Sequence, residues 1–230
     1  MKRDSKEFFL TDTKLGDAIF RFYFFIVIFT FLLGVLLTQR VIALSDFVQT
    51  LGIQLLLLGS LLWIRFKYRW SPLVGSFKRI LISSFILIFL YGAILFFVDW
   101  LLVLSGSSEG RAWNPRYSMI QLFSLLILAP INEELFFRDL LFRSQNSRWK
   151  NLWLSGLFSS FAFMVAHLSL YPGAFLLGLI SCALFVVSRS IVPSIVFHFL
   201  SNASLFFIPQ IFPALAQFLL KIGLFPTFYR

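Results

Sequence analysis

Long apolar runs recur along the whole chain, and they constrain its fold more than any other feature. A helix needs about 20 apolar residues to cross the hydrocarbon core of a bilayer. Seven clear runs reach about this length, and an eighth, 211–225, contains Pro213 and Gly223, which predicts a short, tilted or re-entrant helix. The pattern therefore predicts an all-α, polytopic transmembrane helix bundle of seven or eight spans. The seven clear runs are 18–38, 43–64, 80–104, 117–137, 152–169, 173–188 and 191–208.

Composition supports a membrane protein and argues against other classes. The chain is 59% hydrophobic and only 13% charged, whereas soluble domains carry about a quarter charged residues. The formal net charge is +10, but Lys and Arg lie in the gaps between apolar runs, a pattern that orients membrane proteins and makes nucleic-acid binding a poor interpretation. Cys182 is the single cysteine, which excludes an intrachain disulfide and a cysteine-based metal site.

The distribution of basic residues also predicts the orientation. With the N-terminus in the cytoplasm, fifteen of the twenty Lys and Arg residues lie on the cytoplasmic side, and only Arg40, Arg111 and Arg116 lie in loops on the other. The first apolar run is long enough to span and no small-residue cleavage site follows it, so we expect an uncleaved first span. No repeat or long loop interrupts the pattern, which predicts one integral-membrane domain over 1–230.

Few ionisable side chains fall within the predicted spans, and most of them are close together. Glu133, Glu134, Arg138 and Asp139 lie near the end of the fourth run, where each charge costs roughly 2.5 to 3.5 kcal/mol and usually marks function. Glu134 and Arg138 are four residues apart and share a helix face, while Glu133 is rotated by about 100° and can face a cavity. Pro130 removes a backbone donor one turn earlier and can kink the helix. A purely structural polar clamp between helices is the competing interpretation.

Two histidines complete the set of groups that could carry chemistry. His167 and His198 are the only histidines of the chain, and Asn202 follows His198 by one helical turn. A carboxylate in apolar surroundings can act as general base on water, and imidazole and carboxamide donors can stabilise an oxyanion. Glu133, His167 and His198 are also a ligand set for a catalytic zinc ion, although an H-E-x-x-H helix is absent. We prefer the carboxylate-activated water. Asp99, near the outer end of the third run, is interpreted as a helix-pairing carboxylate.

These residues fall into three spaced motifs. They are EELFFR at 133–138, FMVAH at 163–167 and HFLSN at 198–202. In this order the motifs resemble the signature of the CAAX protease and bacteriocin-processing (CPBP, or Abi) family of intramembrane proteases. The resemblance covers roughly 117–206, whereas the N-terminal spans 18–104 are similar only in being hydrophobic and helical.

The resemblance implies a role for each motif residue. It implies Glu133 as the base that activates water, assisted by His167, with His198 and Asn202 forming the oxyanion site. Glu134 and Arg138 are expected to order the site. The family has been described both as metalloproteases and as glutamate-dependent proteases, so the metal question stays open. Asp139 departs from the family pattern, which has glycine there, and could pair with Arg143 or compete for Arg138.

The resemblance also implies partners and a location. The expected substrate is a membrane-anchored protein or peptide, and the short loops and compact size resemble bacterial members, which predicts a multi-pass protein of the plasma (inner) membrane. A prenylated substrate is not expected on this basis. Two other functions compete: a catalytically silent binder of membrane peptides, such as a bacteriocin self-immunity protein, and a proton-coupled transporter. The absence of repeated halves with paired broken helices weighs against the transporter.

Overall fold

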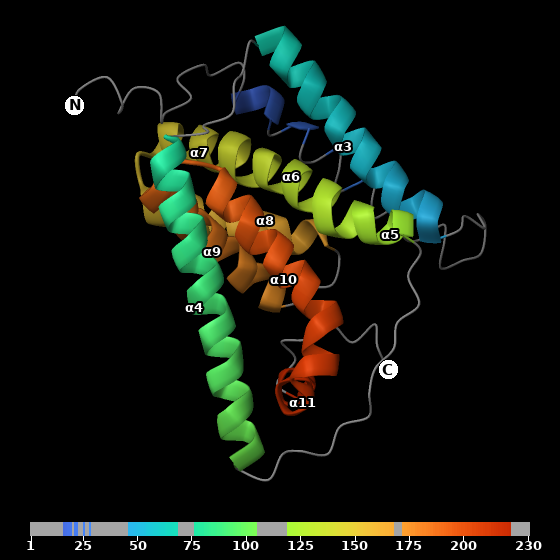
Figure 1. The fold of residues 1–230 in the computed structure, drawn as a ribbon. Coiled ribbons are helices and arrows are strands. Elements are labelled where there is room, and N and C mark those ends of the chain that lie inside the picture. Colours follow the sequence, from blue (N-terminus) through green and yellow to red (C-terminus); the bar gives the residue numbers. More distant parts are fainter. Residues whose placement is uncertain are drawn as a thin grey trace.

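The computed structural model describes residues 16–19, 21, 22, 25, 28, 46–68, 76–104, 119–167 and 172–221, and the described part is helical with no strand (Figure 1). The all-α prediction is confirmed. The helices are α3 (Asp46–Tyr68), α4 (Phe77–Leu104), α5 (Met119–Phe123), η1 (Ser124–Leu128), α6 (Ala129–Glu134), η2 (Leu135–Phe142), α7 (Arg143–Trp149), α8 (Leu152–Ala166), α9 (Pro172–Ser188), α10 (Val192–Ile211) and α11 (Pro213–Lys221).

Three helical stretches of the described residues are long and apolar enough to cross a membrane. They are Ile80–Leu104, Met119–Trp149 and Val192–Pro209, and shorter apolar helices cover Gln54–Ile64, Leu152–Ala166 and Pro172–Ser188. No residue in the most apolar part of the first stretch is fully buried within the chain, as expected for a helix that faces lipid along much of its surface. The molecule is therefore an integral membrane protein. The expected first span, 18–38, lies almost wholly outside the described residues.

The longest helical stretch differs from the sequence-based expectation. The fourth span was expected to end at residue 137 and a cytoplasmic loop to follow, but helix continues through η2 and α7 to Trp149. Two of the basic residues that suggested a loop, Arg138 and Arg143, are paired inside the helix with acids four residues earlier. The chain turns only at Lys150, which has a left-handed φ of 52°, and Asn151 then caps α8 by accepting from the Leu154 N–H.

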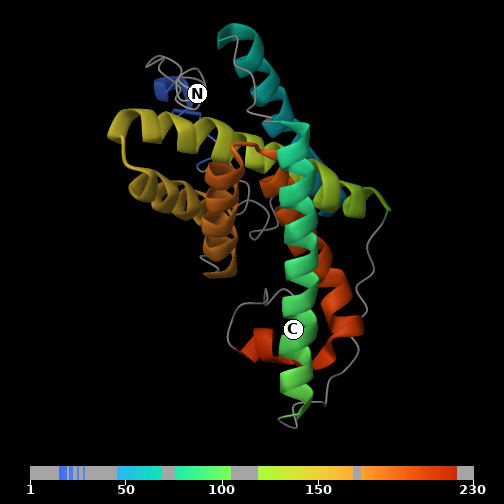
Figure 2. The same ribbon diagram turned by 60° about the vertical axis from the view of Figure 1, so that its left-hand side comes forward.

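This long helix crosses the bundle instead of running along it. In both views its axis lies at a steep angle to α4, while α10 runs beside α4 (Figures 1 and 2). Tyr91 on α4 supports the α4–α10 contact, packing edge-on against Phe197. The crossing brings the middle of the long helix against α3, α8 and α10, which places its acidic residues at a junction of four helices.

Pro130 does not break the long helix but is preceded by a π-helical turn. The Ala129 N–H donates to the Ser124 carbonyl, five residues back. The next donor in that register would be residue 130, which as proline has no N–H, so the Leu125 carbonyl has no donor from its own helix. Asn202 Nδ2 on α10 donates to this oxygen at 2.9 Å. The expected kink at Pro130 therefore takes the form of a π-turn tied to a neighbouring helix.

Small residues let α8 and α9 approach closely. A Cβ on Gly178 would lie 2.9 Å from both Cα and Cβ of Ser160, so only glycine fits at that crossing. Ser159 Oγ donates to the Phe137 carbonyl at 2.6 Å and joins α8 to η2. Ser194 Oγ donates to the Ser181 carbonyl at 2.8 Å and joins α10 to α9. These interhelical bonds fix α8, α9 and α10 around the long helix.

Asp99 acts at the start of the last expected span. Within the described residues, α11 takes up nine residues of the run 211–225, about 13.5 Å of helix. Asp99 Oδ1 accepts a hydrogen bond from the Leu215 N–H at 3.0 Å. A carboxylate at a helix N-terminus satisfies a free donor and suits the helix dipole. The interpretation of Asp99 as a helix-pairing residue agrees with this contact.

Candidate active site

A fully buried ion pair forms the base of the site. Arg138 Nε lies 3.1 Å from Glu134 Oε2, and both side chains are completely buried. The guanidinium carbon lies 4.4 Å from the centroid of the Phe163 ring on α8, a cation–π geometry. The pairing expected from the spacing of four residues is therefore present, and Phe163 links it to the second motif.

His198 connects this pair to the reactive side of the site. Its Nδ1 lies 2.9 Å from Glu134 Oε1, and its ring is 2% exposed. Because the carboxylate opposite Arg138 is an acceptor, Nδ1 carries a proton, and Nε2 is the ring nitrogen that faces away from Glu134. Nε2 lies 3.8 Å from Glu133 Oε2. A series of side-chain contacts therefore runs from Arg138 through Glu134 and His198 to Glu133.

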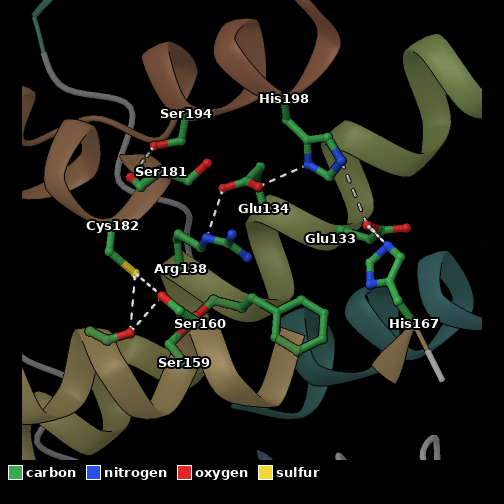
Figure 3. Close-up of polar contacts among 12 residues, drawn as sticks. Glu133, Glu134, Arg138, Ser159, Ser160, His167, Ser181, Cys182, Ser194 and His198 are labelled. Atoms are coloured by element: carbon green, nitrogen blue, oxygen red, sulfur yellow. Dashed lines mark hydrogen bonds and ion pairs between the residues drawn. The ribbon is translucent and has the colours of Figure 1, made fainter. Parts of the chain in front are cut away.

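His167 approaches Glu133 from the other side (Figure 3). Its Nε2 lies 3.7 Å from Glu133 Oε2, while its Nδ1 donates at 2.9 Å to the Phe163 carbonyl, which can only accept. The His167 side chain is 39% exposed and that of Glu133 13% exposed. The two imidazoles therefore converge on one carboxylate oxygen, at a place that is open on the His167 side.

The other oxygen of Glu133 is held by a residue that the sequence analysis missed. Gln54 Nε2 on α3 donates to Glu133 Oε1 at 3.1 Å, across 79 residues of sequence. Asn132 Nδ2 in turn donates to the Gln54 backbone carbonyl at 3.0 Å and to Gln54 Oε1 at 3.2 Å. In the sequence, Gln54 is a lone amide inside an apolar run. The spacing of neighbouring polar residues does not indicate what it contacts.

Asn202 lies on the same helix face as His198, one turn further on, as expected. One of its two amide N–H groups is engaged with the Leu125 carbonyl, so only the other can serve a second acceptor. Asp139 pairs with Arg143 at 2.8 Å, both nearly or fully buried. Of the two alternatives raised by the sequence, Asp139 pairs with Arg143, and Arg138 keeps Glu134.

The separations of the same side chains bear on the alternative of a zinc ion held by Glu133, His167 and His198. Among the described residues, no group of three His, Cys, Asp or Glu side chains has a geometry that could hold a metal ion. Zinc ligands lie about 2.0 to 2.2 Å from the ion, which brings donor atoms closer together than the 3.7 and 3.8 Å found here. The donor atoms of Glu133, His167 and His198 therefore lie a few tenths of an ångström further apart than those around a bound zinc ion.

Comparison with known proteins places this site in a family. Residues 115–204 match the family model described as type II CAAX prenyl endopeptidase Rce1-like, and this segment contains all three motifs. This model is of the CPBP family, the family that the three motifs resemble. No curated protein and no solved structure matches the chain. In this CPBP segment, Glu133, Glu134, Arg138, His167, His198 and Asn202 all lie within the match, whereas Gln54 and the rest of α3 lie outside it.

Proposed function

We propose that the protein is an intramembrane endopeptidase in which Glu133 activates a water molecule for attack on a peptide bond. The observation that carries the proposal is the convergence of His167 and His198 on Glu133 Oε2. Glu133 Oε2 is itself buried and has no hydrogen-bond partner within the described residues. A buried carboxylate oxygen without a partner requires a hydrogen-bond donor, and a water molecule beside the two imidazoles meets this requirement in a protease.

The hydrogen bonds at the far sides of the rings define what that water does. Both Nδ1 atoms are engaged as donors, so Glu133 Oε2 and the Nε2 of a neutral His167 ring present lone pairs to the same place. A water there donates its hydrogens to Oε2 and to His167 Nε2, which turns an oxygen lone pair outward. That orientation suits attack on a carbonyl carbon.

The proposed reaction uses only groups of this chain and the substrate. Glu133 takes a proton as the water oxygen bonds to the scissile carbonyl carbon, and the carbonyl π electrons move to its oxygen. The tetrahedral intermediate collapses when the carbon–nitrogen bond breaks. The proton passes from Glu133 to the leaving nitrogen, and the products are a carboxylic acid and an amine.

His198 and Asn202 are proposed to stabilise the oxyanion. His198 Nε2 can donate only when both ring nitrogens carry protons, and the adjacent Glu134 carboxylate balances the charge of that cation. The amide N–H of Asn202 that is not bonded to Leu125 is the second donor. Such donors typically contribute about 2.7 to 4 kcal/mol each to catalysis.

The proposed substrate is a membrane-anchored protein or peptide of a bacterial plasma membrane. The site lies among the packed apolar helices of the bundle, some of which are long and apolar enough to span a membrane. The matched family model is named for prenyl endopeptidases, but the activity proposed here requires only that the substrate reach the open, His167 side of the site from the membrane.

A comparison of membrane proteomes tests this function. Cells with the wild-type protein are compared with cells carrying Glu133→Gln, and new protein N-termini are sought by terminal labelling. The proposal expects at least one cleaved membrane protein whose new terminus disappears with Glu133→Gln while the variant remains at wild-type level in the membrane. Identical termini in both cell types would instead favour a catalytically silent binding protein.

A further inference from the structure

Gln54 is an isolated amide in an apolar helix, and its burial requires an explanation. It is 6% exposed and belongs to the run GIQLLLL on α3. A buried amide away from water must form hydrogen bonds or lose the free energy of desolvation. Its donor atom is used on Glu133 and its acceptor atom on Asn132. Both ends of the amide are therefore engaged with the α6 helix that carries the proposed base.

The orientation of this amide follows from an atom that can only accept. The Gln54 backbone carbonyl accepts from Asn132 Nδ2, which fixes which end of the Asn132 amide faces α3. The same nitrogen donates to Gln54 Oε1, so the Gln54 nitrogen must point the other way, to Glu133 Oε1. Flipping either amide would set donor against donor or acceptor against acceptor.

As a consequence, each of the two oxygens of the Glu133 carboxylate has its own surroundings. The last torsion of a glutamate is broad and roughly two-fold, so a free Glu133 could turn either oxygen, or the edge of its plane, to the site. With Oε1 bonded to Gln54, Oε2 is the oxygen that faces His167 and His198.

We propose that Gln54 is a positioning residue for Glu133, oriented by Asn132, and that α3 thereby supplies part of the hydrolytic site from outside the CPBP segment. This rests on the proposed function of Glu133 as base. Gln54 touches neither the water nor the peptide bond in this scheme. It acts by holding the plane of the carboxylate, an effect that belongs to the rate of the chemical step and not to substrate affinity.

The first test measures the contact itself and does not depend on activity. Melting temperatures of the purified protein in lipid nanodiscs are compared for wild type, Gln54→Leu, Glu133→Leu and the double variant. Leucine is close in size to glutamine and removes both amide bonds. The proposal expects Gln54→Leu to lower the melting temperature in the wild-type background, and to lower it much less when Glu133 is already leucine. Equal decreases in melting temperature in both backgrounds would show that Gln54 and Glu133 do not interact.

The second test measures the role, with a packing control on the same helix. Leu57 lies three residues from Gln54 and is buried in the core, so Leu57→Ala disturbs α3 without touching Glu133. The substrate is a peptide spanning a cleavage site found in the proteome comparison. For Gln54→Leu the proposal expects kcat to fall roughly 10- to 100-fold with KM within about twofold, and Leu57→Ala to leave kcat near wild type.

The outcomes distinguish the positioning role of Gln54 from the proposed function of Glu133 as base. If Gln54→Leu and Leu57→Ala change kcat alike, or if Gln54→Leu changes only KM, Gln54 is a structural residue and the positioning role is overturned, while Glu133 remains the base. If Glu133→Gln itself keeps wild-type kcat, the proposed function fails, and the melting-temperature cycle still reports whether Gln54 and Glu133 interact.

Discussion

At the scale of single residues, the site is built from pairs that each satisfy one buried charge. Glu134 is bonded to Arg138 and to His198, and Glu133 to Gln54. Two adjacent glutamates thus have different surroundings: one is enclosed and fully buried, and the other retains an oxygen directed at the open side. The rotation of about 100° between neighbouring helical residues makes this division possible.

Removing Arg138 is expected to destabilise the fold strongly. Arg138→Met leaves the Glu134 carboxylate buried without its cation, which typically costs about 3 to 5 kcal/mol. Thermal unfolding in nanodiscs measures the effect. Arg148→Met, at an exposed position on α7, serves as control and should change stability by no more than about 0.5 kcal/mol. Glu134→Gln added to Arg138→Met should restore part of the loss; similar stabilities for Arg138→Met and Arg148→Met would contradict the buried pair.

At the scale of helices, backbone groups freed by special residues are satisfied by neighbouring helices. The Leu125 carbonyl, freed by Pro130 and the π-turn, accepts from Asn202. The start of α11 donates to Asp99. In lipid, where no water is available to these groups, such contacts hold helices together and fix their rotation. Asn202 is thereby held against the long helix about two helical turns before Glu133.

The link between Pro130 and Asn202 can be tested by combining substitutions. Asn202→Leu leaves the Leu125 carbonyl without a donor and should cost about 1 to 3 kcal/mol. The Pro130→Ala variant has an N–H at position 130 that can donate to the same carbonyl. The loss caused by Asn202→Leu should therefore be smaller in that background, measured by thermal unfolding. An equal loss in both backgrounds would show that Asn202 does not compensate for the proline.

The contact between α8 and α9 makes a second prediction at this scale. Gly178→Ala places a Cβ 2.9 Å from Ser160, so the two helices must separate, at a cost of about 1 to 3 kcal/mol. A Cβ added to Gly92 on α4 would meet nothing within 4 Å, and this glycine is exposed, so Gly92→Ala should be neutral or stabilising by up to about 1 kcal/mol. Comparable melting temperatures for the two variants would rule out the close α8–α9 approach.

At the scale of the whole molecule, the outer surface and the inner site follow opposite rules. Phe85, Phe89 and Phe96 on α4 are 73%, 67% and 67% exposed, as expected for a helix in lipid. Polar side chains are buried where the long helix crosses α3, α8 and α10. The crossing gives one short segment, 132–138, access to three neighbouring helices at once, and a hydrolytic site needs groups from several directions.

The sequence predicted the parts of this arrangement that depend on local spacing. Long apolar runs indicated the helices, and the spacing of four residues indicated the Glu134–Arg138 pair and the shared face of His198 and Asn202. It did not predict that helix continues beyond residue 137, because internal ion pairs neutralise charges that resemble a loop. It also missed Gln54, whose partner is 79 residues away, since a contact set by helix crossing leaves no pattern in either segment.

The central claim is that Glu133 activates water without a metal ion, and steady-state cleavage by the purified protein tests it most directly. The substrate is a peptide spanning a cleavage site found in the proteome comparison, and phenanthroline is added in a parallel reaction. We expect Glu133→Gln to fold normally and to lose about 100-fold or more of the kcat, and the wild-type rate to be unchanged by the chelator. Wild-type activity in Glu133→Gln, or loss of wild-type cleavage on chelation that returns with zinc, would contradict it.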